Sequence, residues 1–495
     1  MTVPNGPYLV LGCGLAGVAA AEALAGRDAV TVWDEHDGPA TRARRERLQA
    51  RGVRVLLEPW EPALLDGAGL VVKSPGVPHD AAPVRDALRA GLLVIDELDL
   101  GRRLTRRPLV AVTGTDGKST VCALVAQTLG EDVPVAGNTD FELPLSALPP
   151  GDGPAVVEVS SYQAEFCAEP FATLAVLTNV TREHLHRHRT IADYAAIKRR
   201  LFIGGGRTVA RAVVSADSEP ARALARELAA AGSEVATFGL ADGAGHRVLD
   251  ASWDARTARA TIATPDGELA VRSRLPGRHN AANVAAAIAA CDLLGVPRAH
   301  TLATIAASPG VPGRWEHIDE GQPFSAIVDF AHTVAALEAV LQTARAIADR
   351  TGARVHHAFS AGGGTDPSKR GPFGRLASTL ADRAVVTEGA GRGEPRERVI
   401  AAILAGAAPG GTPLEAIPDR RAAIRAVLAG AEPGDLVLVT GRGAMARLIS
   451  HTSGEGKEFD DRVVVREELR ELGYAGADGA ARTREGARER RSRGG

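Results

Sequence analysis

The stretch GTDGKST, residues 114–120, stands between the apolar run Leu109–Thr113 and a second apolar run, Val121–Leu129. A strand, a glycine loop and a helix in this order bring backbone N–H groups and the positive end of a helix around phosphate oxygens. In such a loop a lysine adds a positive charge, and a hydroxyl group can reach a Mg²⁺ ion. The loop is shorter than the usual P-loop pattern. We still predict nucleotide phosphate binding by Gly114, Thr115, Asp116, Gly117, Lys118, Ser119 and Thr120.

A second glycine turn lies near the N-terminus. GCGLAG, residues 12–17, follows the short apolar run Tyr8–Leu11, and Asp34 closes the next apolar run. This spacing fits the dinucleotide-binding fingerprint, in which an acidic residue stands about 20 positions after the glycines. By themselves these glycines indicate only a tight turn and the close approach of another group, whose identity they do not specify. NAD, the pyrophosphate of a UDP-sugar and a purely structural turn therefore all remain open.

Three α/β segments follow one another along the chain. With 495 residues the chain is too long for one hydrophobic core. Apolar strands alternate with alanine-rich helices throughout, and Ser308–Arg314, rich in proline and glycine, is typical of a hinge. We predict domains at residues 1–106, 107–312 and 313–474, and a disordered tail at residues 475–495, where apolar residues are almost absent.

The composition is that of an ordinary soluble protein. The chain is 45% hydrophobic and 24% charged, with a formal net charge of -2, and nothing in this balance suggests a nucleic-acid partner. The four cysteines show no CxxC spacing, which disfavours a disulfide framework or a zinc site. No targeting segment or membrane-spanning run is evident. We expect a cytoplasmic monomer that acts on small molecules.

Two further features carry candidate metal ligands. Glu158 ends an apolar strand, where a carboxylate can face bound phosphates; a solvent-facing acid on an edge strand is an equal alternative. His184, His186 and His188 lie within five residues. Because no cysteine accompanies them, a single histidine beside Mg²⁺ or a surface histidine run is favoured over a zinc cluster.

Taken together, these residues resemble the Mur ligases, which add amino acids to peptidoglycan precursors. The resemblance covers residues 7 to about 470. Its motifs occur in the family's order: the loop 114–120, Gly137-Asn138, EVSSYQ at 158–163, the block from Asn179 to His188, YAAIK at 194–198, and His279-Asn280 with Asn283. The resemblance implies an α/β fold with a Rossmann-like N-terminal domain, a central P-loop ATPase-like domain and a C-terminal Rossmann-like domain.

The resemblance also implies a role for each matching position. Lys118 would hold the β and γ phosphates of ATP, and Ser119 a first Mg²⁺ ion. Glu158, His184 and a carbamylated Lys198 would hold a second Mg²⁺ ion. ATP would also meet Asn283, Arg314 and Asp329. The acceptor substrate would meet Gly14, Leu15, Asp34, Ser74 and Asn138, and the incoming amino acid would meet His332 and Arg392.

Different parts of the chain resemble different branches of the family. Residues 7–312 look most like the MurD branch, which adds D-glutamate, whereas the third domain looks like the MurE branch, which adds the third residue. The Asp-Asn-Pro-Arg motif of enzymes that use meso-diaminopimelate becomes Gly389-Ala390-Gly391-Arg392, and a Gly-Lys-Gly-His-Glu segment becomes GRGAM at 441–445. Diaminopimelate is therefore disfavoured.

We predict ATP-dependent addition of D-glutamate to UDP-N-acetylmuramoyl-L-alanine through an acyl phosphate. The alternative is a MurE-type amino-acid ligase that acts on another UDP-muramoyl or carboxylate substrate in a different pathway. Two hypotheses from other classes rest on one motif each. An NAD-dependent oxidoreductase would rest on residues 12–17 alone, and a P-loop ATPase switch on residues 114–120 alone.

Overall fold

The structure is a computed structural model that describes residues 2–138, 143–364, 366–449 and 456–474. The tail predicted at residues 475–495 lies outside the described residues. The chain forms two compact units, one made of residues 1–249, 262–269 and 282–305, and the other of residues 250–261, 270–281 and those from 306 onward. Within the described ranges, no helix is both long and apolar enough to cross a membrane.

The N-terminal domain is a parallel five-stranded sheet in the order β3-β2-β1-β4-β5. Its elements are β1 (Tyr8–Leu11), α1 (Leu15–Leu24), β2 (Val30–Asp34), α2 (Pro39–Gln49), β3 (Arg54–Leu57), η1 (Pro62–Leu65), β4 (Leu70–Lys73), α3 (Ala82–Arg89), β5 (Val94–Asp96) and α4 (Glu97–Leu104). Alternate residues of each strand pack into two buried clusters. One cluster includes α1 and the other includes α3, so both faces of the sheet are covered.

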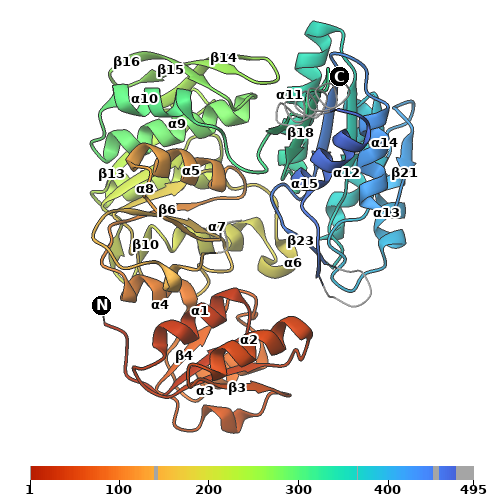
Figure 1. Cartoon of the computed structure of the whole chain (residues 1–495). Coiled ribbons are helices and arrows are strands. Elements are labelled where there is room, and N and C mark those ends of the chain that lie inside the picture. Colours follow the sequence, from red (N-terminus) through yellow and green to blue (C-terminus); the bar gives the residue numbers. More distant parts are fainter. Residues whose placement is uncertain (1, 139–142, 365, 450–455, 475–495) are drawn as a thin grey trace, which may run out of the picture. The chain divides into compact units, whose positions relative to one another are not determined.

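The central domain contains a nine-stranded sheet in the order β16-β15-β14-β13-β12-β9-β6-β8-β7 (Figure 1). Its first elements are β6 (Leu109–Thr113), α5 (Lys118–Leu129), β7 (Val135–Gly137), η2 (Leu145–Ala147), β8 (Ala155–Val159), β9 (Leu174–Leu177), α6 (Leu185–His188), α7 (Ile191–Arg199), β10 (Ile203–Gly204), β11 (Arg207–Thr208) and β12 (Arg211–Ser215). The remaining elements are α8 (Glu219–Ala230), β13 (Glu234–Gly239), β14 (His246–Trp253), β15 (Ala258–Thr264), β16 (Gly267–Ser273), α9 (Arg278–Leu293) and α10 (Arg298–Ala307).

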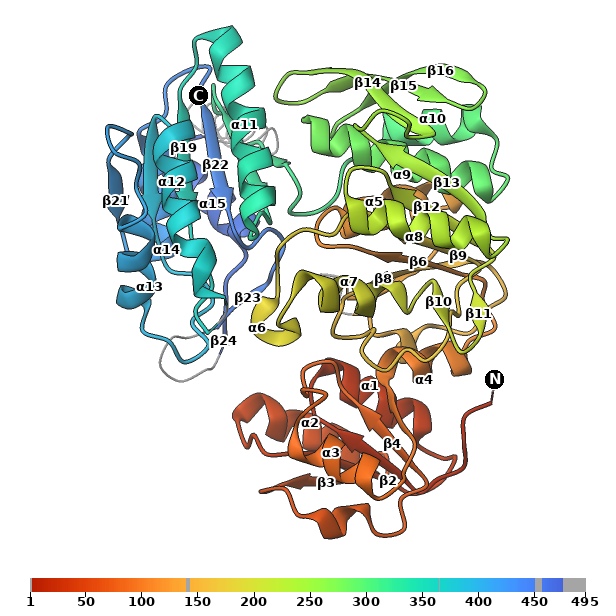
Figure 2. The same cartoon turned by 180° about the vertical axis from the view of Figure 1, so that it is seen from behind.

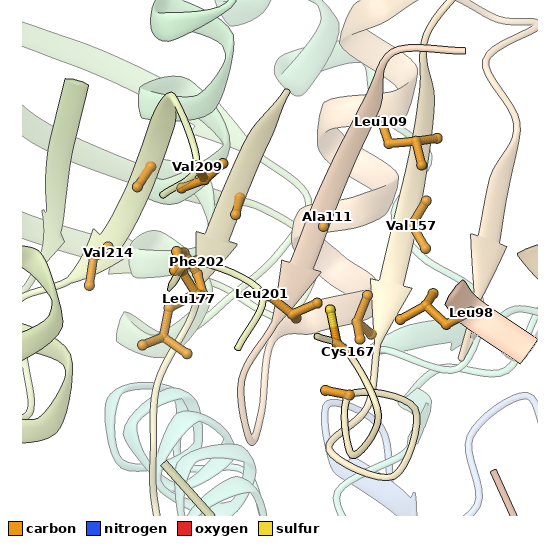
Figure 3. Close-up of a cluster of buried hydrophobic side chains, with 14 of the residues drawn as sticks. Leu98, Leu109, Ala111, Val157, Cys167, Leu177, Leu201, Phe202, Val209 and Val214 are labelled. Carbon is orange, nitrogen blue, oxygen red and sulfur yellow. The ribbon is translucent and has the colours of Figure 1, made fainter. Parts of the chain in front are cut away.

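The core of this sheet reaches back to the N-terminal domain. Figure 3 shows Leu109, Val157 and Leu177 packed in one cluster together with Leu98 of α4. Leu100, two residues further along α4, belongs instead to the N-terminal core. Because α4 contributes to both cores, it joins the two domains by apolar contact and not by a flexible linker alone.

The C-terminal domain is a six-stranded sheet in the order β17-β18-β22-β19-β20-β21. Its elements are β17 (Glu316–Ile318), β18 (Ser325–Asp329), α11 (Val334–Thr351), β19 (Val355–Phe359), η3 (Pro367–Lys369), α12 (Arg370–Leu380), β20 (Arg383–Val386), α13 (Arg396–Leu404), β21 (Leu414–Ala416), α14 (Arg420–Ala429), β22 (Leu436–Thr440), β23 (Arg447–Ile449), β24 (Gly456–Glu458) and α15 (Asp461–Glu471). Helices α11 to α13 cover one face and α14 and α15 the other (Figure 2). The expected α/β class, with a Rossmann-like sheet at each end, is confirmed.

Candidate active site

The loop between β6 and α5 has the backbone of a phosphate-binding turn. Gly114 and Gly117 have φ angles of +150° and +82°, which side-chain-bearing residues rarely adopt. A Cβ atom on Gly114 would lie 1.8 Å from Thr178 Oγ1, and one on Gly117 would lie 2.3 Å from Asn283 Oδ1. Gly117 immediately precedes α5, so the free N–H groups of the first helical turn open at this loop. The predicted strand–loop–helix arrangement is therefore present, and Asn283 lies against it.

Two side chains after β9 hold this loop in place. The Thr178 hydroxyl group donates to the Asp116 carbonyl oxygen at 2.6 Å. Asn179 Oδ1 accepts the N–H groups of Thr115 at 3.1 Å and Asp116 at 2.9 Å, and Asn179 Nδ2 donates to the Asp116 carbonyl oxygen at 3.1 Å. No role was predicted for either residue from the sequence. The available signal was a polar pair directly after an apolar strand, where the carboxyl ends of parallel strands meet.

Glu158 is buried on an interior strand. Its strand β8 lies between β6 and β7, and its side chain is 2% exposed, so the alternative of a solvent-facing acid on an edge strand is wrong. Glu158 Oε2 accepts a hydrogen bond from the Ser119 hydroxyl group at 2.7 Å. Glu158 Oε1 accepts one from Asn138 Nδ2 at 3.0 Å. Three predicted site residues, Ser119, Asn138 and Glu158, thus lie together beside the loop.

Lys198 is tied to the same loop from α7. Its side chain is 1% exposed, and its Nζ donates to the Gly114 carbonyl oxygen at 2.7 Å. Burial, reinforced by the nearby charge of Lys118, holds the pKa of Lys198 well below its usual range. Lys118 Nζ itself donates to the Thr115 carbonyl oxygen at 2.8 Å. A depressed pKa favours the neutral amine, which is the form that carbamylation needs; the carbamate itself stays a prediction.

His184 is held by an aromatic neighbour. The Tyr162 hydroxyl group lies 3.1 Å from His184 Nδ1, and the His184 backbone has a φ angle of +56°. His188 Nε2 instead contacts Ser161 Oγ at 2.8 Å, and burial lowers the pKa of His188 to about 4. In the part of the chain that the structure describes, no group of three or more His, Cys, Asp or Glu side chains is placed to hold a metal ion; the His186 side chain is outside that part.

The donor atoms beside the loop suit Mg²⁺. This ion prefers oxygen ligands and in nucleotide sites takes only one or two protein ligands, the rest being water and phosphate oxygens. Glu158 Oε2 and Ser119 Oγ lie 2.7 Å apart at the start of α5 and offer such oxygens. Binding of Mg²⁺ by Ser119, Glu158, His184 and Lys198 stays a prediction, and the structure joins the first two directly.

The N-terminal glycine turn closes on β4. A Cβ atom on Gly12, which has a φ angle of +96°, would lie 3.1 Å from the Ser74 side chain, whose hydroxyl group donates to the Gly12 carbonyl oxygen at 3.2 Å. Asp34 Oδ2 accepts the N–H group of Cys13 at 2.7 Å. The predicted substrate contacts Gly14, Leu15, Asp34 and Ser74 therefore surround one turn, with Gly14 at the start of α1 and Leu15 46% exposed.

Arg314 and Asp329 belong to the second unit and lie close in that unit's fold. Asp329 ends β18, and its Oδ2 accepts the N–H group of Trp315 at 2.7 Å. The Arg314 guanidinium carbon lies 4.1 Å from the centre of the Phe330 ring. The predicted contact of both residues with ATP stays a prediction.

His332 and Arg392 follow β18 and β20, two strands of the same sheet that are separated by β22 and β19. His332 Nδ1 lies 3.2 Å from the Phe330 carbonyl oxygen, and Lys369 Nζ donates to the His332 carbonyl oxygen at 3.1 Å. Arg392 is exposed and has a φ angle of +46° in the loop after β20. Their role in amino-acid binding stays a prediction.

A glycine phosphate loop at the carboxyl edge of a parallel sheet, with a buried carboxylate and a buried lysine beside it, defines a nucleotide-dependent enzyme. The chain belongs to the Mur ligase family: residues 7–96 match the MurD-like N-terminal domain, residues 112–291 the middle domain, and residues 313–443 the glutamate ligase domain. It therefore has the three-domain Mur ligase fold and is an ATP-dependent, ADP-forming ligase of peptidoglycan synthesis that joins an acid to an amino acid.

Curated relatives come from both branches of the family. The chain is 32% identical over 471 residues to the UDP-N-acetylmuramoyl-L-alanyl-D-glutamate–2,6-diaminopimelate ligase of Streptomyces coelicolor, a match that covers 82% of this chain and 88% of the relative. It is 36% identical over 345 residues to the UDP-N-acetylmuramoylalanine–D-glutamate ligase of Paramagnetospirillum magneticum, covering 65% and 70%. The expected mixture of MurD-like and MurE-like features is confirmed.

Solved structures show the same fold. A UDP-N-acetylmuramate–alanine ligase from Thermotoga maritima matches with a TM-score of 0.61 at 21% identity, covering 94% of this chain and 99% of that one. A UDP-N-acetylmuramoyl-L-alanyl-D-glutamate–2,6-diaminopimelate ligase matches with a TM-score of 0.52 at 24% identity, covering 90% and 93%.

Proposed function

We propose that this chain is a MurE-type ligase that joins an amino acid other than meso-diaminopimelate to the terminal carboxylate of a UDP-muramoyl precursor. The observation that carries the proposal is the match to a diaminopimelate-adding ligase over 82% of the chain. A UDP-N-acetylmuramyl-tripeptide synthetase of Roseiflexus, 33% identical over 81% of this chain, supports it further. These relatives favour the MurE-type alternative over D-glutamate addition.

The amino acid differs because the third-domain motif differs. At the position of the Asp-Asn-Pro-Arg motif the chain has Gly389-Ala390-Gly391-Arg392, which keeps only the arginine. A site that has lost a carboxylate and an amide loses hydrogen-bond partners for the polar far end of diaminopimelate. An amino acid with a different side chain is therefore the better substrate.

The chemistry follows from the residues around the phosphate loop. A carboxylate oxygen of the acceptor forms a bond to the γ-phosphorus atom of ATP, the bond to the β-γ bridging oxygen breaks, and ADP leaves. The amino group then attacks the acyl carbon, and phosphate leaves as the amide forms. Lys118 and the N–H groups at the start of α5 stabilise the phosphate charge, and Asn138 orients Glu158. Mg²⁺ held by Ser119, Glu158, His184 and carbamylated Lys198 would neutralise further phosphate charge.

Addition of D-glutamate to UDP-N-acetylmuramoyl-L-alanine is the second candidate. The MurD-like match of residues 7–96 favours it, because the domain that would hold the acceptor resembles that of the D-glutamate-adding branch. The Paramagnetospirillum relative, a D-glutamate ligase, supports it over 65% of the chain. The two candidates differ in the acceptor, which ends in L-alanine for one and in D-glutamate for the other.

The test is ADP formation by the purified protein with ATP and Mg²⁺, scanned over both acceptors and a panel of D- and L-amino acids, with the product identified by mass spectrometry. Turnover on the D-glutamate-terminated acceptor supports the MurE-type proposal. Turnover on the L-alanine-terminated acceptor with D-glutamate alone supports the second candidate and contradicts the first. ADP formation with diaminopimelate as the best amino acid contradicts the predicted change of side chain.

A further inference from the structure

Two arginines share one carboxylate inside the C-terminal domain. Arg420 Nε and Nη2 donate to the two oxygens of Asp461 at 2.8 Å and 2.5 Å, and both side chains are fully buried. Arg442 is 2% exposed, and its Nε lies 3.8 Å from Asp461 Oδ1, beyond hydrogen-bond distance. Since Arg420 binds both oxygens of Asp461, Arg442 shares this carboxylate only at 3.8 Å and forms no hydrogen bond with it.

The hydrogen bonds of Arg442 leave part of its guanidinium group unused. Nη2 donates to the carbonyl oxygens of Met445 at 3.1 Å and Phe459 at 2.9 Å. Nε and Nη1 are buried and have no hydrogen-bond partner. Burial, together with the charge of Arg420, lowers the pKa of Arg442 to about 10, so the group is still charged at neutral pH. A buried cation with unused donors is costly, and a bound anion would offset that cost.

The other carboxylates near Arg442 already have partners. Asp460 forms a salt bridge with Arg462 at 2.6 Å. Glu388 lies 3.5 Å from Arg396 and 3.9 Å from Lys457. Within the described part of the chain, none of these acids therefore forms a hydrogen bond with Arg442.

This charge lies at the edge of the sheet where α/β proteins bind ligands. Arg442 stands two residues after β22, which lies between β18 and β19. Arg420 donates to Ser360 Oγ after β19, to the Glu388 carbonyl oxygen after β20 and to the Thr440 carbonyl oxygen at the end of β22. It thus gathers the loops after three neighbouring strands, and the crevice outside such carboxyl ends is the usual ligand site.

Glycines flank Arg442 on both sides. Gly441 and Gly443 have φ angles of +104° and +51°, which side-chain-bearing residues rarely adopt, and the Gly441 N–H group donates to the Asp329 carbonyl oxygen at 3.1 Å. The backbone therefore fixes Arg442 in the loop after β22. Arg392, exposed after β20, offers a second cation at the same edge of the sheet.

We propose that Arg442 pairs with the side-chain carboxylate of the incoming amino acid, so that this ligase selects an acidic amino acid. Two cations at this edge match two carboxylates, one on the α-carbon and one on the side chain, and a guanidinium fork binds a carboxylate bidentately. The proposal rests on the proposed function and names the class of amino acid that this function requires.

The test compares Arg442→Met, which removes the charge but keeps most of the side-chain length, with Arg442→Lys, which keeps the charge. The control is Arg466→Met on α15, an exposed side chain whose partner Glu320 lies at 2.9 Å and is also paired with Arg470. The full-length proteins are heated with glutarate, glutamate or glutamine, and the shift in Tm is measured. We expect glutarate and glutamate to stabilise the natural protein and the control, and to lose this effect in Arg442→Met. Without ligand, Arg442→Met should be no less stable, because an uncompensated charge has been removed.

Kinetic measurements distinguish binding of the side-chain carboxylate by Arg442 from binding of the α-carboxylate. We expect Arg442→Met to raise the KM for an acidic amino acid by about tenfold or more and to change kcat less, with Arg442→Lys between the two. Equal weakening of acidic and neutral amino acids would assign Arg442 to the α-carboxylate and overturn the proposal, as would equal use of glutamate and glutamine by the natural protein. If no amino acid supports ADP formation, the proposed function fails, whereas Arg442-dependent stabilisation by glutarate would still support an anion site.

Discussion

Replacing Asn179 with alanine tests whether the phosphate loop is prearranged for ATP. Asn179 contacts both Thr115 and Asp116, yet not every contact would be lost in the variant. The Thr115 N–H group would keep its bond to the Asn179 carbonyl oxygen at 3.0 Å. The Asp116 carbonyl oxygen would keep the Thr178 hydroxyl group at 2.6 Å. The Asp116 N–H group would lose the Asn179 side-chain oxygen that accepts it at 2.9 Å.

The expected loss of ATP affinity follows from the hydrogen bond that the Asp116 N–H group would lose. One backbone N–H group left without its acceptor costs about 1 to 2 kcal/mol, which corresponds to roughly tenfold in an equilibrium constant. If the loop must be reordered when ATP binds, the loss is seen as a roughly tenfold increase in the Kd for ATP, measured by calorimetry with a non-hydrolysable analogue. Thr178→Val removes the other bond to the Asp116 carbonyl oxygen. The double variant should therefore weaken binding by more than the two single effects combined.

A stability control is available on α7. Thr190 accepts the N–H group of Asp193 at 3.0 Å as the helix N-cap, so Thr190→Ala should lower the free energy of unfolding by about 1 kcal/mol while leaving the Kd for ATP unchanged. An unchanged or tighter Kd in Asn179→Ala would refute the reasoning. Tighter binding would mean that Asn179 occupies an N–H group that ATP itself could use.

Three further outcomes are expected. Glu158→Gln keeps the size of the side chain but removes its charge, and should raise the Mg²⁺ concentration needed for half-maximal turnover roughly tenfold or more, with Mn²⁺ binding followed by EPR as a second measurement. Lys198→Met should abolish the carbamate signal that isotope-labelled bicarbonate gives in the NMR spectrum, and lower turnover, without lowering the Tm; a persisting signal would place the carbamate elsewhere. Burial and the charge of Arg420 lower the pKa of His357 to about 3, whereas the unfolded chain has the ordinary value of about 6.5. Between these two pH values His357 binds a proton more readily in the unfolded chain, so the free energy of unfolding falls as the pH falls through this window. His357→Gln should therefore lose about 3 kcal/mol less than the natural protein in urea titrations between about pH 7 and about pH 4.5.

Strands with continuous apolar runs could be read directly from the sequence. The runs Leu109–Thr113 and Ala155–Val159 coincide with β6 and β8, because strands buried on both faces need apolar side chains at nearly every position. By contrast, β14 (His246–Trp253) is half exposed and has no such run, and it was not predicted. The helix after the first glycine turn begins at Leu15, inside the stretch GCGLAG itself, so the glycine pattern alone does not mark where the helix starts.

The candidate site was predictable where local sequence carries the chemistry. The loop at 114–120 has a characteristic order of glycines, lysine and hydroxyl groups, and Glu158 ends an apolar strand beside it. The contacts of Asn179 with Asp116 were not predictable, because the two residues are 63 positions apart and meet only through the order of β9 and β6 in the sheet. Long-range strand order is the information that periodicity in a single sequence does not contain.

The same distinction separates the reaction from its selectivity. Activation of a carboxylate by ATP depends on a loop and a carboxylate on neighbouring strands of one sheet, so a family motif identifies it. Selection of the amino acid depends on which charges the C-terminal domain leaves uncompensated. Arg442 is an ordinary arginine in the sequence, and its unused donors become evident only when Asp461, 19 positions away, is seen to be engaged by Arg420. A chain can therefore keep the motif of its family while the balance of buried charge changes the substrate that it accepts.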